Sequence, residues 1–321
     1  MGRYLLRRLG FALLLIFVVS SAALVLTRIA PGDFSTIDPT LDPAVRARIR
    51  EELGLDRPLA AQYLSWLGGA VHFDFGRSML YSRPVSTLVR ERALNTAMLA
   101  SVALVLATAI GLPLGVYSGS RRGGLGHSAV RAISVLGISV PPLIGSLALV
   151  FVAARTGWFP VGGMTSAGGL DMSWARWLAD LARHIPVPAL ALAIPLAASL
   201  ERLQSQALEA AAREPFVAAS RARGLERTRA LLRHAWPVSL RPVLGLYGVM
   251  IGSLFSGSFV VEVVTSWPGL GRLMFDALKA RDLFLVAGCA ATGAMFLAVG
   301  TLVADLLLAW TDPRVASGER A

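Results

Sequence analysis

Six long runs without Asp, Glu, Lys or Arg constrain this 321-residue sequence more than any other feature. A helix needs about 20 apolar residues to cross the ~30 Å hydrocarbon core of a bilayer. The runs are close to that length, so the sequence predicts an all-α integral membrane protein with six transmembrane helices. The predicted spans are Leu9–Thr27, Ala93–Ser120, Ala132–Ala154, His184–Leu200, Pro242–Val261 and Leu283–Ala304, the last continuing past Asp305 to Trp310.

The first run has two possible interpretations. Its basic start at Arg3, Arg7 and Arg8 and the small residues at Ser20–Ala23 also fit a cleaved signal peptide. The apolar stretch, however, is longer than the 7–15 residues typical of a signal-peptide core. We therefore expect it to be retained as the first span.

Arginine bias predicts the orientation of the spans, because short cytoplasmic connections carry the excess of basic residues. With the N-terminus inside, segments 1–8, 121–131, 201–241 and 311–321 have net charges of +3, +3, +4 and 0. The outside segments 28–92, 155–184 and 262–282 have +1, +1 and 0. Both termini are therefore predicted to be cytoplasmic. Nucleic-acid binding would place a basic stripe on a soluble module, whereas this charge flanks membrane spans.

Two other chemistries are disfavoured by residue counts. The chain has one lysine, Lys279, and a phosphate-binding Walker A loop needs a Gly-Lys-Ser/Thr sequence that is absent here. Cys289 is the only cysteine, and the four histidines are far apart. This excludes an internal disulfide and a zinc site built on a cysteine pair. We expect Cys289 to be a small apolar packing residue, and we expect neither a metal site nor a bound cofactor.

Small and polar residues within the spans have two possible uses. Glycine and serine at spacings of four let helix backbones approach closely, or they line a polar pathway. These residues are Gly111, Gly115, Gly248, Gly252, Ser253 and Ser256. Pro141-Pro142 and the prolines at 186, 188 and 195 are expected to break or kink their helices.

Two acidic residues are associated with the spans. Asp305 lies within the last span, and we favour a structural ion pair or hydrogen bond over proton coupling. Glu262 lies at the outer end of its span, where exposing a carboxylate costs little.

The first predicted domain, residues 1–92, joins the first span to a small extracytoplasmic region. Asp42-Pro43 opens a predicted helix to about Leu53, and a second helix covers Leu59–Val71. Tyr63 and Trp66 are expected to anchor this region at the lipid interface. The region either stabilises the first span or docks an outside partner. Residues 93–321 form the second predicted domain.

The cytoplasmic loop 201–241 is predicted to project a helix–glycine turn–helix. Glu214-Pro215 starts a helix, Gly224 permits a left-handed turn, and a second helix is expected to end before Trp236-Pro237. The predicted apolar face comprises Phe216, Val217, Leu225, Leu231 and Leu232. An amphipathic loop could lie on the membrane surface, but the length of this loop and the glycine turn within it favour docking to a cytoplasmic partner.

Residues Phe216–Leu225, which read F-V-A-A-S-R-A-R-G-L, resemble the EAA loop of permease subunits in binding-protein-dependent ABC importers. The general loop opens Glu-Ala-Ala, whereas Ala218, Ala219 and Ser220 stand here. The resemblance to the dipeptide, oligopeptide and nickel branch covers nearly the whole chain. It rests on segments 3–8, 30–33, 53–58, 74–78, 261–271, 280–282 and 312–314.

The resemblance implies a type I ABC importer permease fold in a bacterial inner membrane. It implies a second homologous permease, two cytoplasmic ATPases that bind ATP and Mg²⁺, and an extracytoplasmic substrate-binding protein. The ATPases would contact Phe216, Val217, Ala218, Ala219, Ser220, Arg221, Ala222, Arg223, Gly224 and Leu225, with Phe216 and Leu225 seated in their groove. It also implies an extracytoplasmic turn formed by Trp267, Pro268, Gly269 and Gly271.

The resemblance therefore implies a subunit of an ATP-driven importer. This subunit would have no catalytic residues and would move di- or oligopeptides by alternating access. The same assembly could carry nickel chelates, glutathione-like peptides, opines or sugars. A secondary carrier is the alternative of another class, and it would require internal repeats and coupling acids at mid-membrane, where Asp305 is the one candidate. A membrane-embedded enzyme would require clustered reactive side chains in the spans.

Overall fold

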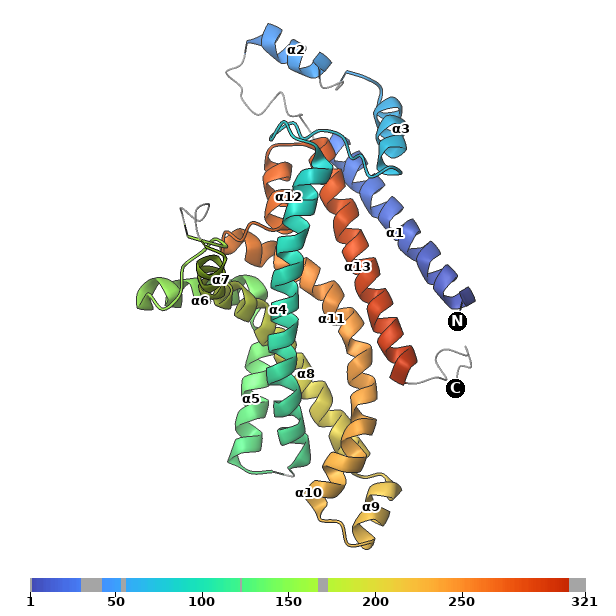
Figure 1. The fold of residues 1–321 in the computed structure, drawn as a ribbon, viewed down its shortest axis with the longest axis vertical. Coiled ribbons are helices and arrows are strands. Elements are labelled where there is room, and N and C mark those ends of the chain that lie inside the picture. The colour runs from blue at the N-terminus through green and yellow to red at the C-terminus, as the bar shows by residue number, and fades with distance from the viewer. Residues whose placement is uncertain (1, 30–41, 53–55, 122, 167–172, 312–321) are drawn as a thin grey trace. The chain divides into compact units, whose positions relative to one another are not determined.

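The computed structural model describes residues 2–29, 42–52, 56–121, 123–166 and 173–311. Within these ranges the side chains at 2–7, 28, 46, 49, 52, 59 and 304–311 are not described. Three quoted motifs, at 30–33, 53–55 and 312–314, lie outside the described residues. Helices account for the fold of the described part, as predicted (Figure 1). Their bounds are α1 Gly2–Ile29, α2 Pro43–Glu52, α3 Leu59–Ala70, α4 Val85–Ser120, α5 Leu125–Ser139, α6 Pro142–Thr156, α7 Trp174–His184, α8 Pro186–Ala211, α9 Pro215–Ala222, α10 Arg227–Ala230, the π-helix η3 Leu231–Ala235, α11 Trp236–Val264, α12 Leu270–Lys279 and α13 Leu283–Thr311.

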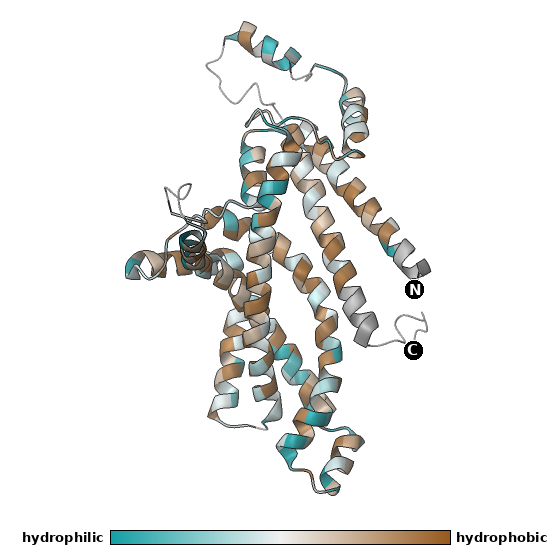
Figure 2. Cartoon of the chain, in the orientation of Figure 1, coloured by the Kyte–Doolittle hydropathy of each residue, from teal (hydrophilic) through white to brown (hydrophobic). Residues whose placement is uncertain are grey.

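Five helical stretches within the described residues are long and apolar enough to cross a membrane, and a sixth span is possible if one bent helix pair is counted. These stretches are Arg8–Thr27, Val85–Ser120, Pro186–Ala211, Arg227–Val264 and Leu283–Val303. Figure 2 shows that they are mostly hydrophobic, while hydrophilic residues gather on α2 and around α9 and α10. The six-span prediction therefore matches the structure in number when the bent pair is one span.

The third predicted span, Ala132–Ala154, is not one straight helix. α5 and α6 meet at Val140-Pro141 and are bent by 105° (Figure 1). A proline disfavours helical backbone at the residue before it, and Val140 is extended, with φ −90° and ψ 111°. Pro142 then occupies the first turn of α6, where a missing N–H costs nothing. The expected break at the proline pair is thus present, and it separates two helices.

The fourth predicted span continues further than the sequence suggested. Pro186 and Pro188 lie in the first turn of α8, and the helix runs unbroken through Pro195 to Ala211. The break that proline could have caused at position 195 is absent. α8 packs against α5, α6 and α11, and these contacts stabilise a helix in which one proline removes a single backbone hydrogen bond.

Two compact units divide the chain, and each has its own core. The first comprises residues 98–267 and 299–321, and the second comprises residues 2–97 and 268–298. In the first unit, a core cluster joins α4, α7, α8 and α11. The two domains predicted from the sequence, residues 1–92 and 93–321, are defined by function as well as by packing. That division stays a prediction.

In the second unit, Trp66 is 5% exposed and packs with Leu24, Met79, Leu283 and Ala287. The Tyr63 hydroxyl lies 2.9 Å from the Ser21 hydroxyl of α1. The prediction that Trp66 is a lipid anchor is therefore wrong, because helices of this chain cover its ring. Cys289 is 1% exposed in an apolar cluster, as its small apolar neighbours indicated.

Candidate functional site

The helix α9 begins and ends at the residues that the sequence marked. Glu214 is extended before the helix, and Pro215 fills its first position. At the other end, the Gly224 N–H donates to the Arg221 carbonyl at 2.9 Å and the Leu225 N–H donates to the Ser220 carbonyl at 3.3 Å. This pair of bonds is a Schellman motif, which requires a left-handed residue at the Gly224 position. The φ of Gly224 is +93°, so glycine is suited to the turn.

A small apolar cluster supports α9 from beneath. It joins the end of α8 to α9, α10 and η3, and Leu225 packs against it. Its buried members are Leu208, Ala211, Val217, Ala230, Leu231 and Ala235. We call residues 212–235, with this cluster, the α9 knob.

The apolar face predicted for this segment divides into two parts. Val217 and Leu231 are 2% and 5% exposed, whereas Phe216 and Leu232 are 41% and 45% exposed. Leu225 is half-buried against the cluster, and its expected seat in the ATPase groove beside Phe216 stays a prediction. A helix sequence shows which residues share a face, but the Schellman turn directs the residue after Gly224 back onto the helix.

The remaining residues of the segment are mostly on the surface. Ser220 is 1% exposed, and its hydroxyl donates to the Val217 carbonyl at 2.7 Å. The exposed residues are Ala218, Ala219, Arg221, Ala222, Arg223 and Gly224. α9 thus presents Phe216, short side chains and arginines on its outer side.

The prediction that the second helix of the loop ends before Trp236-Pro237 is wrong. α10 continues through η3 directly into α11, and Arg227–Val264 is one helical run of 38 residues. Proline inside an α-helix clashes with the carbonyl four residues earlier. A π-turn inserts one residue and changes that spacing, and the π-turn here lies immediately before Pro237.

Glycines of α4 are contact points with α8. A β-carbon built at Gly111 would lie 2.5 Å from the Ala197 carbonyl oxygen, and one at Gly115 would lie 2.7 Å from Gln204 Cβ. Neither distance is possible for a real side chain, so glycine at these positions allows the two backbones to approach. Gly119, one turn further, is equally close to Ser205.

The small residues of α11 are placed differently. Gly248 is buried and Gly252 is half-buried, while Ser253 and Ser256 are exposed on the surface of the chain. The Ser253 hydroxyl donates to the Met250 carbonyl at 2.9 Å, within its own helix. The Ser253 bond therefore does not hold α11 to another described helix.

Two buried polar contacts were not predicted. The Ser118 hydroxyl of α4 donates to the Glu201 carboxylate of α8 at 2.5 Å, and Gln204 Nε2 donates to the Ser239 hydroxyl of α11 at 2.8 Å. Glu201 is 3% exposed and Gln204 is 0% exposed. The sequence indicated Glu201 and Gln204 only through their position near the end of an apolar run. A polar residue that is buried there must find a hydrogen-bond partner.

Glu262 is fully buried, which corrects the expectation that its carboxylate would be exposed. α11 ends two residues later in a second Schellman motif, in which the Trp267 N–H donates to the Glu262 carbonyl at 2.9 Å. Ser266 takes the left-handed position with φ +53°, and Trp267 is 0% exposed. Burial of Trp267 in the core of its unit holds this turn in place. Asp305 is in α13, but its side chain is outside the described part of the chain.

The turn that follows is fixed by polar contacts within the second unit. The Pro268 carbonyl accepts from Asn95 Nδ2 at 2.8 Å and from Arg92 Nη1 at 3.3 Å. The Leu270 N–H at the start of α12 donates to the Thr96 hydroxyl at 2.8 Å. Gly269 is the residue before α12, and Gly271 is half-buried in its first turn.

Among the described residues, no group of three or more His, Cys, Asp or Glu side chains is arranged to hold a metal ion. The polar residues just described join helices to one another. Together with the long apolar helices, this arrangement is that of a multi-pass membrane protein from which the α9 knob projects.

Residues 111–317 match the family described as "Binding-protein-dependent transport system inner membrane component", and residues 1–96 match its N-terminal region family. The oligopeptide transport system permease protein AppB of Bacillus subtilis is 33% identical over 319 residues, covering 98% of this chain and 99% of that protein. The probable peptide ABC transporter permease protein y4tP of Sinorhizobium fredii is 31% identical over 325 residues, with the same coverage. The chain therefore belongs to the family of inner-membrane components of binding-protein-dependent transport systems.

A solved structure of the MetNI methionine ABC transporter in inward-facing conformations has a chain with the same fold. The TM-score is 0.50 at 18% identity, covering 73% of this chain and 97% of that one. This protein is thus a multi-pass inner-membrane permease subunit of an ABC importer. As a member of this family it is a non-catalytic component, and ATP is bound by the ATPase partners of such systems.

Proposed function

We propose that this permease subunit carries peptides, and that the α9 knob is where the cytoplasmic ATPase subunits dock. The peptide assignment is supported by relatives that match nearly the full length of the chain and are named as oligopeptide or peptide permeases. The docking assignment is supported by the geometry of α9 and by its likeness to the EAA loop.

One observation carries the docking proposal. α9 is held from below by the apolar cluster and at its end by the Gly224 turn, yet Phe216 on its outer side is 41% exposed. Exposed aromatic residues on a rigid support are the usual anchors of protein–protein interfaces. A surface that is fixed within its own chain can transmit a partner's displacement, because little of the movement is absorbed by the loop itself.

The helices next to the knob provide the route for that movement. α8 leads into α9 through residues 212–214, and α10 continues through η3 into α11. α8 and α11 pack together along the core of the first unit. ATP binding and hydrolysis in the partners would shift α9, and α8 and α11 would convert this shift into opening towards one side of the membrane or the other.

A second homologous permease is proposed as the neighbour of α11. Ser253 and Ser256 are exposed on a membrane helix of this chain. Polar residues in membrane spans usually face a partner helix or an aqueous pathway. A second permease would cover this face or enclose a pathway against it, and an extracytoplasmic binding protein would deliver the substrate.

The docking proposal is tested with Phe216→Asp and the control Gln206→Asp, which adds the same charge at an exposed position of α8 outside the α9 knob. We expect Phe216→Asp to reduce co-purification of the ATPase subunits by at least roughly 30-fold, the effect of losing about 2 kcal/mol at an interface anchor. Gln206→Asp should co-purify as the wild type does. Equal retention in both variants would refute the role of Phe216.

The substrate is tested separately, in proteoliposomes that contain the complete transporter. Radiolabelled di- and oligopeptides should be taken up in the presence of ATP, and unlabelled peptides should compete. Competition by a nickel chelate or a sugar, but not by peptides, would reject the peptide assignment and leave the docking proposal standing.

A further inference from the structure

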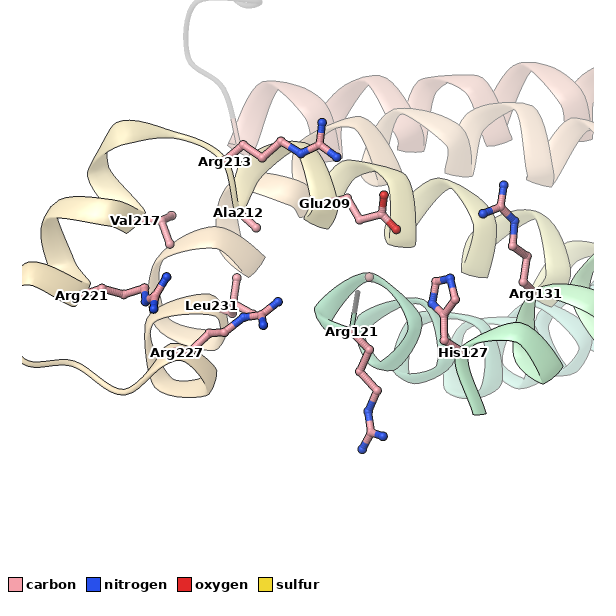
Figure 3. Close-up of a pocket in the computed structure, with 11 residues that line it drawn as sticks. Arg121, His127, Arg131, Glu209, Ala212, Arg213, Val217, Arg221, Arg227 and Leu231 are labelled. Atoms are coloured by element: carbon pink, nitrogen blue, oxygen red, sulfur yellow. The ribbon is translucent and has the colours of Figure 1, made fainter. Parts of the chain in front are cut away.

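A cavity of about 590 Å³ opens beside the α9 knob (Figure 3). Its size is within the ~300–1,000 Å³ range of small-molecule sites. In Figure 3, Val217, Arg221, Arg227 and Leu231 form one side, and Arg121, His127 and Arg131 form the other. Glu209 of α8 points into the space between the two sides.

The charged lining of the cavity is strongly one-sided. Five arginines and one carboxylate line the cavity, and the arginines come from the α4–α5 turn, α5, the α8–α9 connection, α9 and α10. These residues are Arg121, Arg131, Arg213, Arg221, Arg227 and Glu209. Among the described residues, none of the five guanidinium groups lies within 4.0 Å of a carboxylate.

Two of the arginines have weaker contacts. Arg227 Nη2 donates to the Ser120 carbonyl at 3.3 Å, and the Arg121 guanidinium lies 4.4 Å from the centre of the Tyr117 ring. Neither contact neutralises a charge. Positive charges that surround one cavity repel one another, so the arrangement is stabilised when an anion enters it.

The general excess of arginine on the cytoplasmic side does not explain this convergence. The positive-inside bias requires arginines in the connecting segments, but it does not require five different elements to direct them to one cavity. Arg202 and Arg241 show the contrast, because they are exposed like the five cavity arginines but do not line the cavity.

We propose that this cavity binds a phosphate-bearing anion. Guanidinium groups form paired hydrogen bonds with phosphate oxygens, and several arginines around one space are the usual recognition pattern for such groups. The phosphate could belong to the headgroup of an anionic lipid or to a soluble phosphate compound. Once bound, it would join α9 and α10 to the α4–α5 turn. The proposal concerns binding by this chain and does not depend on the docking role of Phe216.

The test compares the full-length chain with Arg131→Gln/Arg213→Gln and with the control Arg202→Gln/Arg241→Gln. Native mass spectrometry in neutral detergent would measure binding of phosphatidylglycerol, phosphatidylcholine and pyrophosphate to each. An arginine near an anionic surface contributes a factor of about five in affinity, so removing two predicts a loss of roughly 25-fold. The anion affinities of the control and of Arg131→Lys/Arg213→Lys should differ from that of the wild type by no more than about twofold to fivefold.

Either source of phosphate gives a distinct supporting result. Preferential binding of phosphatidylglycerol over phosphatidylcholine, lost in the cavity variant, identifies a lipid headgroup. Binding of pyrophosphate without that lipid preference, again lost in the variant, identifies a soluble anion.

Two results would overturn the proposal. In one, the wild type binds neither anion, or the control loses as much affinity as the cavity variant. In the other, the cavity variant binds both anions as tightly as the wild type, which would place the anion site outside the cavity. If the glutamine variant does not fold, hydrogen exchange of the wild type decides the location, because a bound anion should slow exchange in the α4–α5 turn, α9 and α10 and leave other segments unchanged.

Discussion

Two short helices of this permease, α9 and α12, end with the same backbone hydrogen bonds but are stabilised in different ways. α9 ends with Leu225 N–H donating to Ser220 and Gly224 N–H donating to Arg221. α12 ends with Asp282 N–H donating to Ala277 at 2.9 Å and Arg281 N–H donating to Leu278 at 3.1 Å. Both turns are Schellman motifs.

The residue in the left-handed position differs between the two turns. It is Gly224 with φ +93° after α9 and Arg281 with φ +50° after α12. A side chain in this conformation costs about 1–2 kcal/mol, which glycine avoids. The α12 turn therefore needs a compensating interaction that the α9 turn does not.

Asp282 supplies that compensation. Its carboxylate is fully buried and accepts hydrogen bonds from the Ser78 hydroxyl at 2.6 Å, the Leu80 N–H at 3.0 Å and the Leu285 N–H at 3.1 Å. The last of these bonds also caps the start of α13. The comparison shows that α12 is fixed by contacts across its unit, whereas α9 relies on a glycine and a small local cluster.

The largest expected effect is that of Asp282→Ala. Three donors, two of them buried, would lose their acceptor, and we expect the variant to be less stable by about 3–5 kcal/mol. The thermal unfolding midpoint of the purified protein measures this effect. Asp282→Asn retains one acceptor oxygen, so its unfolding midpoint should lie between those of the wild type and Asp282→Ala. An unchanged midpoint for Asp282→Ala would show that Asp282 does not hold the turn.

Gly224→Ala tests the other side of the comparison. Forcing a β-carbon into the left-handed position should destabilise the α9 turn by about 1–2 kcal/mol. Because no carboxylate among the described residues supports this turn as Asp282 supports the other, we expect faster hydrogen exchange in residues 212–235, with the rest of the chain unchanged. If the effect spreads through both units, then α9 is not a local element.

Arg281→Gly should have a smaller effect of opposite sign. It removes the left-handed strain but increases the freedom of the unfolded chain, so we expect stabilisation of at most about 1 kcal/mol. Arg281→Ala, which keeps the strain, is the matched control. Destabilisation by glycine alone would mean that the arginine side chain contributes more to the turn than the backbone strain costs.

Asp180, whose side chain is 15% exposed, provides the smallest expected effect. Hydrogen bonds from the Ser166 N–H at 2.6 Å and the Ser166 hydroxyl at 2.7 Å lower the pKa of Asp180 below its ordinary value of 3.8. A lowered pKa contributes stability above pH 3.8 that is lost as the pH falls through the folded-state pKa. Asp180→Asn should lower the unfolding midpoint at pH 7 only slightly, because the amide oxygen can still accept one of these hydrogen bonds and solvent reaches the side chain. A large decrease there would contradict the distinction between the partly exposed Asp180 and the fully buried Asp282.

The sequence predicts the local features of the fold better than its tertiary ones. Glu214-Pro215 and Gly224 mark the bounds of α9 because capping and left-handed turns depend on one or two residues. The inward direction of Leu225 and the burial of Glu262 and Trp66 depend on which helices pack nearby, and a single sequence does not specify this. Pro141-Pro142 predicts a break between helices but not an angle of 105°.

The continuation of α10 into α11 is another feature that the sequence did not predict. Trp236-Pro237 has the pattern of a helix end, and only the π-turn before it removes the steric conflict. The likeness to the EAA loop points to the α9 knob from sequence alone. The arginine cavity joins residues between 121 and 227, so only the fold brings them together.

The π-turn η3 also has a rotational consequence. In an α-helix each residue turns the chain by about 100°, so the extra residue of a π-turn rotates every later side chain by about that angle around the axis. The direction in which Ser253 and Ser256 face is therefore set, relative to the α9 knob, by five residues at Leu231–Ala235. Deleting one residue from η3 would preserve the helix but would rotate the face of α11 that carries Ser253 and Ser256 away from its present direction.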